Sequence, residues 1–520
     1  MNFLFSRENL FVTILLLFSL LINQYYGSRG VFPLDSFSHF DAGYRILLGE
    51  YPFKDYWTVS GPFIDYLQAV FFYLFGTNWQ SYVLHASLIN VLLTITTYIV
   101  LRNFKLNIYY SLIYSLLFSV LAYPSSGTPF MDHHSAFFSL LGIYNLILAI
   151  KSDKKLYWVL LPIFFGFAFL SKQVPSSYVI VCAILILAIF SLSQRKFFWI
   201  KYSFLSVASF IFLLLIFGRM QGINLSSFIE QYILFPQTIG EERFKNLNFT
   251  LKGTVDRFKF IYLAFLPLLY VNLIKIFTDI NYLKQKNFYY FLCLLLLTFS
   301  LIFHQLLTKN QTFIFFLIPI LTAFSHISLN TYRLNSNSPV FIIIIIICLL
   351  ITTKYHMRFN QDRKFHELNY VNFELFSQGK EIDKKFKGLK WVTPEFKNNS
   401  KEEIILINEA KSYLKNDNRN KMVMTHYSFF SVILDQKLFS PSKWYLTDGT
   451  TNPVKKGKYF TSYKNLITNT IKENNIKVIY AISVESSNIY NYVDSECFRE
   501  KNITELLKSF ELKICDEING

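Results

Sequence analysis

Eleven apolar runs recur along the first two thirds of the chain, and no other feature of the sequence constrains its fold as strongly. The runs lie near residues 10–26, 81–101, 108–123, 133–150, 157–171, 176–192, 202–218, 258–277, 288–304, 312–328 and 339–353. A straight helix needs roughly 20 apolar residues to cross the hydrocarbon core of a bilayer, so the ends of the shorter runs are approximate. We therefore predict a polytopic α-helical membrane protein with about eleven transmembrane helices.

The composition agrees with lipid as the solvent for most of the chain. Hydrophobic residues make up 52% of the sequence and charged residues 16%, whereas soluble domains carry about 25% charged residues. The net charge of +17 would suit a nucleic-acid partner if the basic residues formed one surface. They lie instead in short clusters between the apolar runs, where basic residues set the orientation of membrane helices. We therefore expect no nucleic-acid partner.

The basic clusters predict which side of the membrane each loop faces. If all eleven runs span the membrane, the clusters fall on one side, and the positive-inside rule makes that side cytoplasmic. The residues concerned are Arg7, Arg102, Lys105, Lys151, Lys154, Lys155, Arg195, Lys196, Lys201, Lys275, Lys284, Lys286 and Arg333. The N-terminus is then cytoplasmic. The first run is expected to be an uncleaved anchor, because no small-residue cleavage site follows it.

The same register places two long loops, 27–80 and 219–257, and the C-terminal segment on the outer side. The composition becomes that of a soluble domain from about Lys354, so we predict a membrane domain over 1–353 and an extracytoplasmic domain over 354–520. The elements expected in the latter are buried strands over 422–425 and 477–482 and amphipathic helices over 401–414 and 463–473. Alternating elements of this kind indicate a small α/β domain. Whether Cys497 and Cys515 form a disulfide within it stays open.

The first outer loop carries the carboxylates that we consider for catalysis. Asp35 and Asp41 lie early in this loop, near the exit of the first run. A carboxylate at the membrane surface can take a proton from an attacking hydroxyl group, and two carboxylates this close in sequence could share a divalent cation. The alternative for each is a helix cap or a surface charge. From Pro62 onward we predict a helix over 63–75 that lies in the membrane interface.

Three consecutive polar residues, Asp132, His133 and His134, stand at the mouth of the fourth run. Adjacent histidines point to different faces of a helix, so both cannot easily bind one metal ion. One interpretation is a hydrogen-bonded helix start with Asp132 as the N-cap. The other is that these residues contact a phosphate or a metal ion, with one histidine as the donor or ligand. The sequence leaves both open.

The three short outer loops, 124–132, 171–176 and 304–311, carry almost no positive charge, and two lysines are the exceptions. Lys172 and Lys309 are the only lysine or arginine residues in these loops. Either their side chains snorkel to the membrane surface, or they hold an anionic phosphate at the membrane boundary. Gln173 and Gln311 are placed in the same predicted phosphate site.

The residues of the first outer loop and of the late outer loop together resemble the GT-C membrane glycosyltransferases. The resemblance is to the branch that contains lipid A aminoarabinose transferases, protein O-mannosyltransferases and RgtA/B/C/D-like sugar transferases. It rests on Asp35, Tyr44–Gly49, Tyr51, Pro52, Gly61–Leu67, Leu74–Gly76 and Lys309–Pro319, and it covers roughly residues 5–330. Two positions depart from the pattern. Ser36 stands where the relatives carry Glu, and Gln311 with Thr312 stands where they often carry Arg-Tyr.

The resemblance implies transfer of a sugar from a polyprenyl-phosphate carrier to an acceptor hydroxyl group. The acceptor would be a glycan, a lipid or a protein on the outer face of a bacterial inner (plasma) membrane. Asp35 is expected to be the general base with Asp41 as the second choice, and direct displacement would invert the anomeric carbon. No cofactor is required, although a divalent cation could take part. The residues that bind the acceptor cannot be assigned.

Two other classes of protein stay open at this stage. A transporter or flippase of lipid-linked saccharides predicts charged or broken helices near the bilayer midplane, whereas the polar anomalies here lie at the outer ends of the runs. A non-catalytic membrane scaffold is the third class, and it requires that the outer carboxylates be dispensable.

Overall fold

The computed structural model describes residues 7–309, 313–332 and 338–513, and the chain forms two compact units. The bundle unit consists of Met1–Gly27, Ala86–Leu214 and Asn246–Phe365. The sheet unit consists of Ser28–His85, Leu215–Lys245 and His366–Gly520. Each unit is thus assembled from segments that lie far apart in the sequence.

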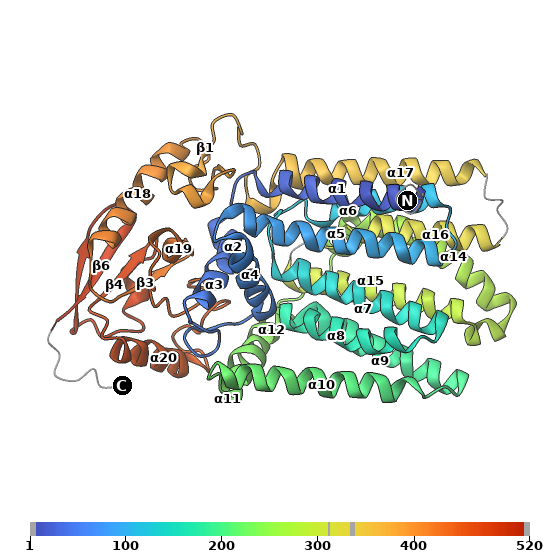
Figure 1. Ribbon diagram of the computed structural model, residues 1–520, viewed down its shortest axis with the longest axis horizontal. Coiled ribbons are helices and arrows are strands. Elements are labelled where there is room, and N and C mark those ends of the chain that lie inside the picture. The colour runs from blue at the N-terminus through green and yellow to red at the C-terminus, as the bar shows by residue number, and fades with distance from the viewer. Residues whose placement is uncertain (1–6, 310–312, 333–337, 514–520) are drawn as a thin grey trace, which may run out of the picture. The chain divides into compact units, whose positions relative to one another are not determined.

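Each of the eleven apolar runs forms a helix within the described residues (Figure 1). These helices are α1 (Arg7–Gly27), α5 (Trp79–Asn103), α6 (Ile108–Ala122), α7 (Met131–Ser152), α8 (Lys155–Ser171), α9 (Gln173–Gln194), α10 (Trp199–Met220), α14 (Lys259–Thr278), α15 (Lys286–Thr308), α16 (Leu317–Tyr332) and α17 (Pro339–His356). Eight apolar helical segments of this described part are long enough to cross a membrane, whereas α6, α8 and α16 have 15, 17 and 16 residues. The polytopic membrane fold is confirmed. That the three shorter helices also span the membrane stays a prediction.

Helix α7 is enclosed by the bundle unit, whereas α10 is not. α7 packs against α8, α9 and α15, and 89% of its most apolar 18-residue window is buried, against 11% for α10. Gly142 on α7 permits the close approach of α8, because a Cβ atom there would lie 2.4 Å from Cε1 of Phe165. Polar side chains at the start of α7 therefore face protein rather than lipid, which is where functional polar groups of membrane proteins are found.

The basic loops of the bundle unit meet at one end of the bundle. The contacts that join them are Arg102 Nη2 with Glu8 Oε1 at 3.2 Å, Lys286 Nζ with the Lys151 carbonyl at 3.0 Å, Lys196 Nζ with Asp153 Oδ2 at 2.8 Å and Gln194 Nε2 with the Lys284 carbonyl at 2.7 Å. These loops alternate with the outer loops along the chain. Their meeting agrees with the register in which successive helices cross the bundle in opposite directions. Arg333, the last residue of the predicted register, lies outside the described residues.

The sheet unit contains the predicted α/β fold. Its four-stranded sheet has the order β3-β4-β6-β5, in which β3 and β4 are parallel and the other neighbours antiparallel. The strands are β3 (Lys421–Thr425), β4 (Val478–Ile482), β5 (Phe498–Asn502) and β6 (Leu507–Leu512), and a second sheet pairs β1 (Ser377–Gln378) with β2 (Lys390–Trp391). Helices α18 (Ser400–Asn416) and α20 (Phe460–Glu473) correspond to the two predicted amphipathic helices, and α20 provides the crossover that a parallel strand pair requires. Both predicted strands and both predicted helices are confirmed.

Shorter elements complete the two units. They are α2 (Pro33–Ser36), α3 (Ser38–Leu47), α4 (Pro62–Phe75), α11 (Leu225–Ile229), η1 (Glu230–Leu234), α12 (Phe235–Lys245), α13 (Leu251–Thr254), η2 (Asp256–Phe258), η3 (Ile280–Lys284), η4 (Met357–Gln361), η5 (Lys364–His366), η6 (Gly379–Glu381), η7 (Lys384–Phe386), α19 (Phe430–Leu434) and α21 (Ser486–Ile489). Cys497 is disulfide-bonded. Cys515, the partner considered from the sequence, lies outside the described residues.

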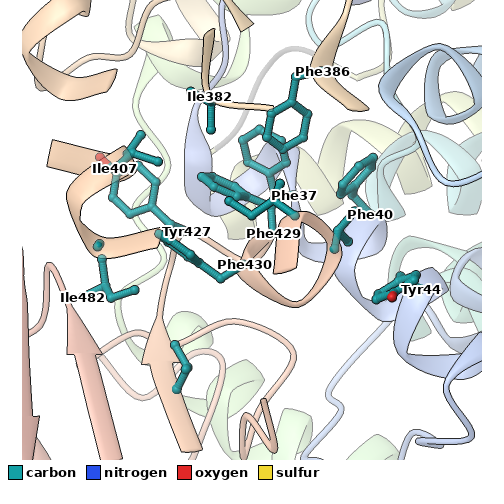
Figure 2. Packing of buried hydrophobic residues seen from close by; sticks show 14 of the residues in the cluster. Phe37, Phe40, Tyr44, Ile382, Phe386, Ile407, Tyr427, Phe429, Phe430 and Ile482 are labelled. Carbon is teal, nitrogen blue, oxygen red and sulfur yellow. The ribbon is translucent and has the colours of Figure 1, made fainter. Parts of the chain in front are cut away.

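An aromatic core joins the first outer loop to the C-terminal segment within the sheet unit (Figure 2). The ring of Phe37, between α2 and α3, lies 5.6 Å from that of Phe386, 5.8 Å from that of Trp391 and 4.8 Å from that of Phe429. Burial of one such side chain contributes about 1.5–3 kcal/mol to folding. The first loop is therefore part of the core of the sheet unit rather than a separate surface layer.

Helix α4 buries its two polar residues together with Ile64, Ala69 and Phe72, and it exposes apolar residues near its C-terminal end. Asp65 and Gln68 are fully buried, whereas Tyr73, Leu74 and Phe75 are 80%, 62% and 52% exposed. At these positions the pattern is the reverse of that of a helix on a water-soluble protein. The predicted helix after Pro62 is confirmed, and its exposed apolar face is what an interfacial position requires.

A buried carboxylate in the sheet unit makes the stability of this unit depend on pH. Glu403 on α18 is fully buried, and it accepts hydrogen bonds from Trp391 Nε1 at 2.8 Å, Thr393 Oγ1 at 3.0 Å and Tyr427 OH at 2.9 Å. Burial raises the pKa of Glu403 to about 7, although these three hydrogen bonds act in the opposite direction. The folded unit therefore retains a proton on this carboxyl group at pH values where an unfolded chain has lost it.

We expect Glu403→Gln to weaken the pH dependence of the stability of the sheet unit. A carboxyl group whose pKa is higher in the folded state stabilises less as the pH rises from its unfolded value, about 4.5, to its folded value, about 7. Above this window the ionised group costs about 3 kcal/mol, and glutamine does not ionise. Thermal unfolding of the purified full chain at about pH 5 and about pH 8 measures the difference. Identical pH dependences for the native chain and the variant would contradict this role.

Candidate active site

One cluster of charged side chains lies in the bundle unit. It is at the ends of the helices that are farthest from the basic loops. Lys172, between α8 and α9, places Nζ 2.9 Å and 2.8 Å from Oδ1 and Oδ2 of Asp132 on α7. His304, in the last turn of α15, places Nε2 2.9 Å from Asp132 Oδ1. The side chains of Lys172, Asp132 and His304 are 15%, 6% and 1% exposed. The structure thus brings together two residues predicted from the sequence and one that was not.

The backbone around Lys172 is fixed to the same cluster. Its carbonyl oxygen accepts hydrogen bonds from Ser135 Oγ at 3.2 Å and from Ser176 Oγ at 2.6 Å. Ser135 lies on α7, one turn after Asp132, so the linker between α8 and α9 is held against the start of α7. The interpretation of Asp132 as an N-cap is wrong, because Phe130 occupies that position and Asp132 accepts from Lys172 instead.

The two adjacent histidines of α7 contact different groups. His133 Nε2 lies 3.3 Å from Ser125 Oγ, and its ring packs edge-on against Phe313 at 4.5 Å. His134 Nδ1 lies 3.2 Å from the carbonyl oxygen of Phe130. Within the described residues no group of three or more His, Cys, Asp or Glu side chains could hold a metal ion. A metal contact of Asp132, His133 or His134 therefore stays a prediction without a cluster to support it.

The remaining residues of the predicted phosphate site lie at the ends of the same helices. Lys309 follows α15 in the left-handed conformation, with φ of 55°, and its side chain is exposed. Gln173 is the first residue of α9 and is half-buried. Gln311 lies outside the described residues. A phosphate-binding role for these three residues stays a prediction.

The two predicted catalytic carboxylates belong to the sheet unit and differ in their surroundings. Asp35 lies in the first turn of α2 and is half-buried. Asp41 lies in the first turn of α3, is buried, and accepts a hydrogen bond from Ser431 Oγ of α19. Burial raises the pKa of Asp41, although the nearby Arg45 acts in the opposite direction. Of the two, Asp35 is the more accessible to a substrate.

A second buried charged cluster, formed by His39, Asp65 and Lys443, lies in the sheet unit. Asp65 on α4 places Oδ1 2.7 Å from His39 Nδ1 and Oδ2 2.7 Å from Lys443 Nζ. Lys443 Nζ also donates to the carbonyl oxygen of Ser60 at 3.2 Å and lies 2.9 Å from His39 Nδ1. Gly61 has φ of 76°, and a Cβ atom there would lie 2.4 Å from Cε1 of His39, so the cluster requires glycine at this position.

The electrostatics of this cluster follow from its burial. Burial raises the pKa of Asp65 to about 7, although Lys443 acts in the opposite direction. Burial also lowers the pKa of Lys443, against the effect of Asp65, and burial together with Lys443 lowers the pKa of His39. Burial thus favours the neutral form of each of the three groups, whereas the contact between Lys443 and Asp65 favours the charged pair.

Several residues of these clusters carried no role in the sequence-based expectations. His304 was missed although it lies in the last turn of an apolar run, where an ionisable residue signals function. Ser431 and Lys443 have no comparable signal. They stand in ordinary soluble sequence, and only the fold brings them to Asp41 and Asp65.

The loop from Trp444 to Pro453 combines aromatic and polar residues, a sequence that suits either a platform for sugar rings or an ordinary turn. Trp444 and Tyr445 are buried, and Asp448 Oδ1 accepts a hydrogen bond from the backbone of Thr450 at 2.9 Å. These contacts favour the turn.

The match of the chain to a protein family favours one of the classes of protein left open by its sequence. Residues 59–218 match the family described as dolichyl-phosphate-mannose-protein mannosyltransferase, over about a third of the chain. The resemblance to the GT-C membrane glycosyltransferases is confirmed. The match supports a membrane glycosyltransferase as the class of this protein.

Similar solved structures include two of ArnT from Cupriavidus metallidurans, one bound to undecaprenyl phosphate and one in the apo state. Each is 12% identical in sequence with a TM-score of 0.48, and the alignment covers 96% of this chain and 97% of ArnT. No curated protein matches the sequence significantly.

Proposed function

We propose that the chain transfers a sugar from a polyprenyl-phosphate donor to an acceptor hydroxyl group on the outer face of a bacterial inner membrane. The observation that carries this proposal is the cluster of Asp132, Lys172 and His304, a buried cation at the end of the bundle away from the basic loops. The matched family acts, by its description, with a dolichyl-phosphate-linked mannose, and we extend the polyprenyl-phosphate donor to this chain. By the positive-inside rule the N-terminus and basic loops are cytoplasmic, which makes the cluster outward-facing.

Lys172 is the proposed contact for the phosphate of the donor. An ammonium group carries three N–H donors, and Asp132 receives two of them through its two oxygens. The third can point to a phosphate oxygen. Asp132, itself in contact with His304, holds the ammonium group in place, and a hydrogen bond from an ammonium group to a phosphate oxygen is charge-assisted.

Asp35 is the proposed general base. The acceptor oxygen attacks the anomeric carbon of the sugar, its proton passes to the Asp35 carboxylate, and the bond from this carbon to the phosphate oxygen breaks. The polyprenyl phosphate leaves with the bonding electron pair, and the configuration at the anomeric carbon inverts. Asp35 suits this role better than Asp41, because Asp41 is buried whereas Asp35 is half-buried.

The test of the proposed function is transfer itself. Membranes that contain the native chain are supplied with a panel of synthetic undecaprenyl-phosphate-linked sugars that carry a radiolabel. We expect the label of one member to move from the carrier to a glycan, lipid or protein fraction. Movement of the intact lipid-linked sugar across vesicles, with no transfer for any member, would favour the flippase instead.

We expect Lys172→Met to weaken binding of undecaprenyl phosphate to the purified full chain roughly ten- to a hundredfold, because a hydrogen bond to a charged group contributes about 1.5–3 kcal/mol. Titration in nanodiscs measures the affinity, and thermal unfolding verifies the fold. Lys196→Met is the matched control. It removes the lysine of the Lys196–Asp153 pair, which lies among the basic loops and has the same length, 2.8 Å, as the Lys172–Asp132 pair. Equal losses in both variants, or none in Lys172→Met, would contradict the phosphate site.

A further inference from the structure

A small pocket with both polar and apolar lining residues lies in the sheet unit where β3 ends. It is lined by the last residues of β3, by the segment from Tyr427 to Ser431, and by Asp41 of the first outer loop. In open α/β sheets ligands bind outside the carboxyl ends of the strands, and Thr425 at the end of β3 lines this pocket. The pocket lies at the corresponding end of β3, the edge strand of this mixed sheet.

The lining of the pocket is rich in hydroxyl groups. Of the lining residues, Thr425, Ser428, Ser431, Ser440 and Ser442 carry hydroxyl groups and Asp41 a carboxylate. The hydroxyl of Thr425 accepts from the backbone of Tyr427, that of Ser431 donates to Asp41 and that of Ser442 donates to the carbonyl oxygen of Trp444. A hydroxyl group donates one hydrogen bond and accepts two, and a carboxylate accepts several. The combination matches the groups on the edge of a sugar ring, each of which donates and accepts.

The charges around the pocket argue against an anionic ligand. Asp41 would repel a phosphate or a carboxylate. Lys443, the cation that lines the pocket, already contacts Asp65 at 2.7 Å, the carbonyl oxygen of Ser60 at 3.2 Å and His39 at 2.9 Å, so its three donors have partners. The free space holds about one water-sized group. The pocket therefore fits one hydroxyl group of a neutral ligand and not a whole saccharide chain.

We propose that this pocket binds a hydroxyl group of a saccharide acceptor, with Asp41 and Ser431 as the binding residues. The inference rests on the proposed function, because transfer requires an acceptor, and it adds the chemical class of that acceptor. Asp41 then orients the acceptor by accepting a hydrogen bond from one of its hydroxyls, while its own bond from Ser431 holds the carboxylate in position.

The experiment measures binding of free monosaccharides to the purified full chain in nanodiscs. Glucose, galactose, mannose and N-acetylglucosamine are tested by saturation-transfer difference NMR without any donor. We expect at least one to bind, Ser431→Ala and Ser428→Ala each to raise its dissociation constant roughly fivefold, and Asp41→Asn to raise it more. Ser487→Ala, which changes an exposed serine of α21 in the same unit, should bind like the native chain.

Either of two results would contradict the proposal that this pocket binds a saccharide. One is that no monosaccharide binds to the native chain, and the other is that the folded serine variants bind as tightly as Ser487→Ala. Binding of undecaprenyl phosphate to the same preparation tests the proposed function separately. If saccharide binding depends on Ser431 but undecaprenyl phosphate does not bind, the saccharide pocket is supported and the polyprenyl-phosphate donor is contradicted.

Discussion

Replacement of Asp35 by asparagine lowers the rate of sugar transfer by about 10²- to 10⁴-fold, the usual contribution of a positioned general base. Asparagine has nearly the same shape but cannot take a proton from the acceptor. Asp35 is half-buried in the first turn of a four-residue helix, and thermal unfolding of the variant verifies that its fold is unchanged. The measurement is the initial rate of transfer with the radiolabelled donor identified by the panel.

Asp55→Asn is the matched control for this prediction. Asp55 belongs to the same loop and its side chain is 30% exposed, but its carboxylate accepts a hydrogen bond from the backbone of Tyr51 at 2.7 Å, which assigns it to a turn. Asp55→Asn should therefore transfer at close to the native rate. If Asp35→Asn also does so, Asp35 is not the base, and Asp41→Asn becomes the decisive variant.

Replacement of Lys443 by methionine should lower the free energy of unfolding of the sheet unit by about 3–5 kcal/mol, because it leaves the buried carboxylate of Asp65 without its cation. Lys443 and Asp65 are 2% and 0% exposed, so water cannot replace the lost contact. Unfolding of the full chain by heat or by denaturant gives the measurement. Lys411→Met tests the effect of burial alone, since its pair with Asp383 is also 2.7 Å long but more exposed, and it should cost about 1 kcal/mol or less.

The effect of Lys443→Met should also grow with pH. The ammonium group of Lys443 lowers the pKa of Asp65, which burial raises to about 7, so its removal moves this pKa higher. A carboxyl group with a raised pKa destabilises the folded state progressively as the pH rises from the unfolded to the folded value. The variant should therefore lose more stability at about pH 8.5 than at about pH 6. Combination with Asp65→Asn should recover part of the loss, and a loss that is independent of pH and of Asp65 would contradict the pairing.

The helices could be predicted from the sequence because the signal is local. An apolar run marks a helix regardless of its neighbours, and the strands and helices of the α/β fold follow from patterns within a few residues. The anomalous residues Asp132 and Lys172 were recognised for the same reason, since each breaks the pattern of its own segment. Their pairing could not be predicted, because they stand 40 positions apart and the register of α7 against α8 depends on packing.

The contacts of the first outer loop show where sequence reasoning stops. Phe37 and Asp41 were visible as an aromatic and a carboxylate in a loop, but their partners Phe429 and Ser431 follow about 390 residues later. Nothing in either segment identifies the other, because aromatic rings and hydroxyls pack with many partners. The pocket therefore could not be predicted from the sequence, although each of its residues is plain in it.

The aromatic core of the sheet unit also has a consequence for the order of synthesis. Phe37 leaves the ribosome long before Phe386, Trp391 and Phe429, the rings that cover it. At about 5–20 residues per second the delay amounts to about 20–80 s, during which the bundle helices must enter the bilayer. The nascent chain thus carries an incomplete aromatic core, with Phe37 still uncovered, while its helices insert into the bilayer. A truncated chain that lacks the last third of the sequence leaves this part of the core permanently uncovered. We expect such a chain to be degraded by the proteases that remove incomplete membrane proteins.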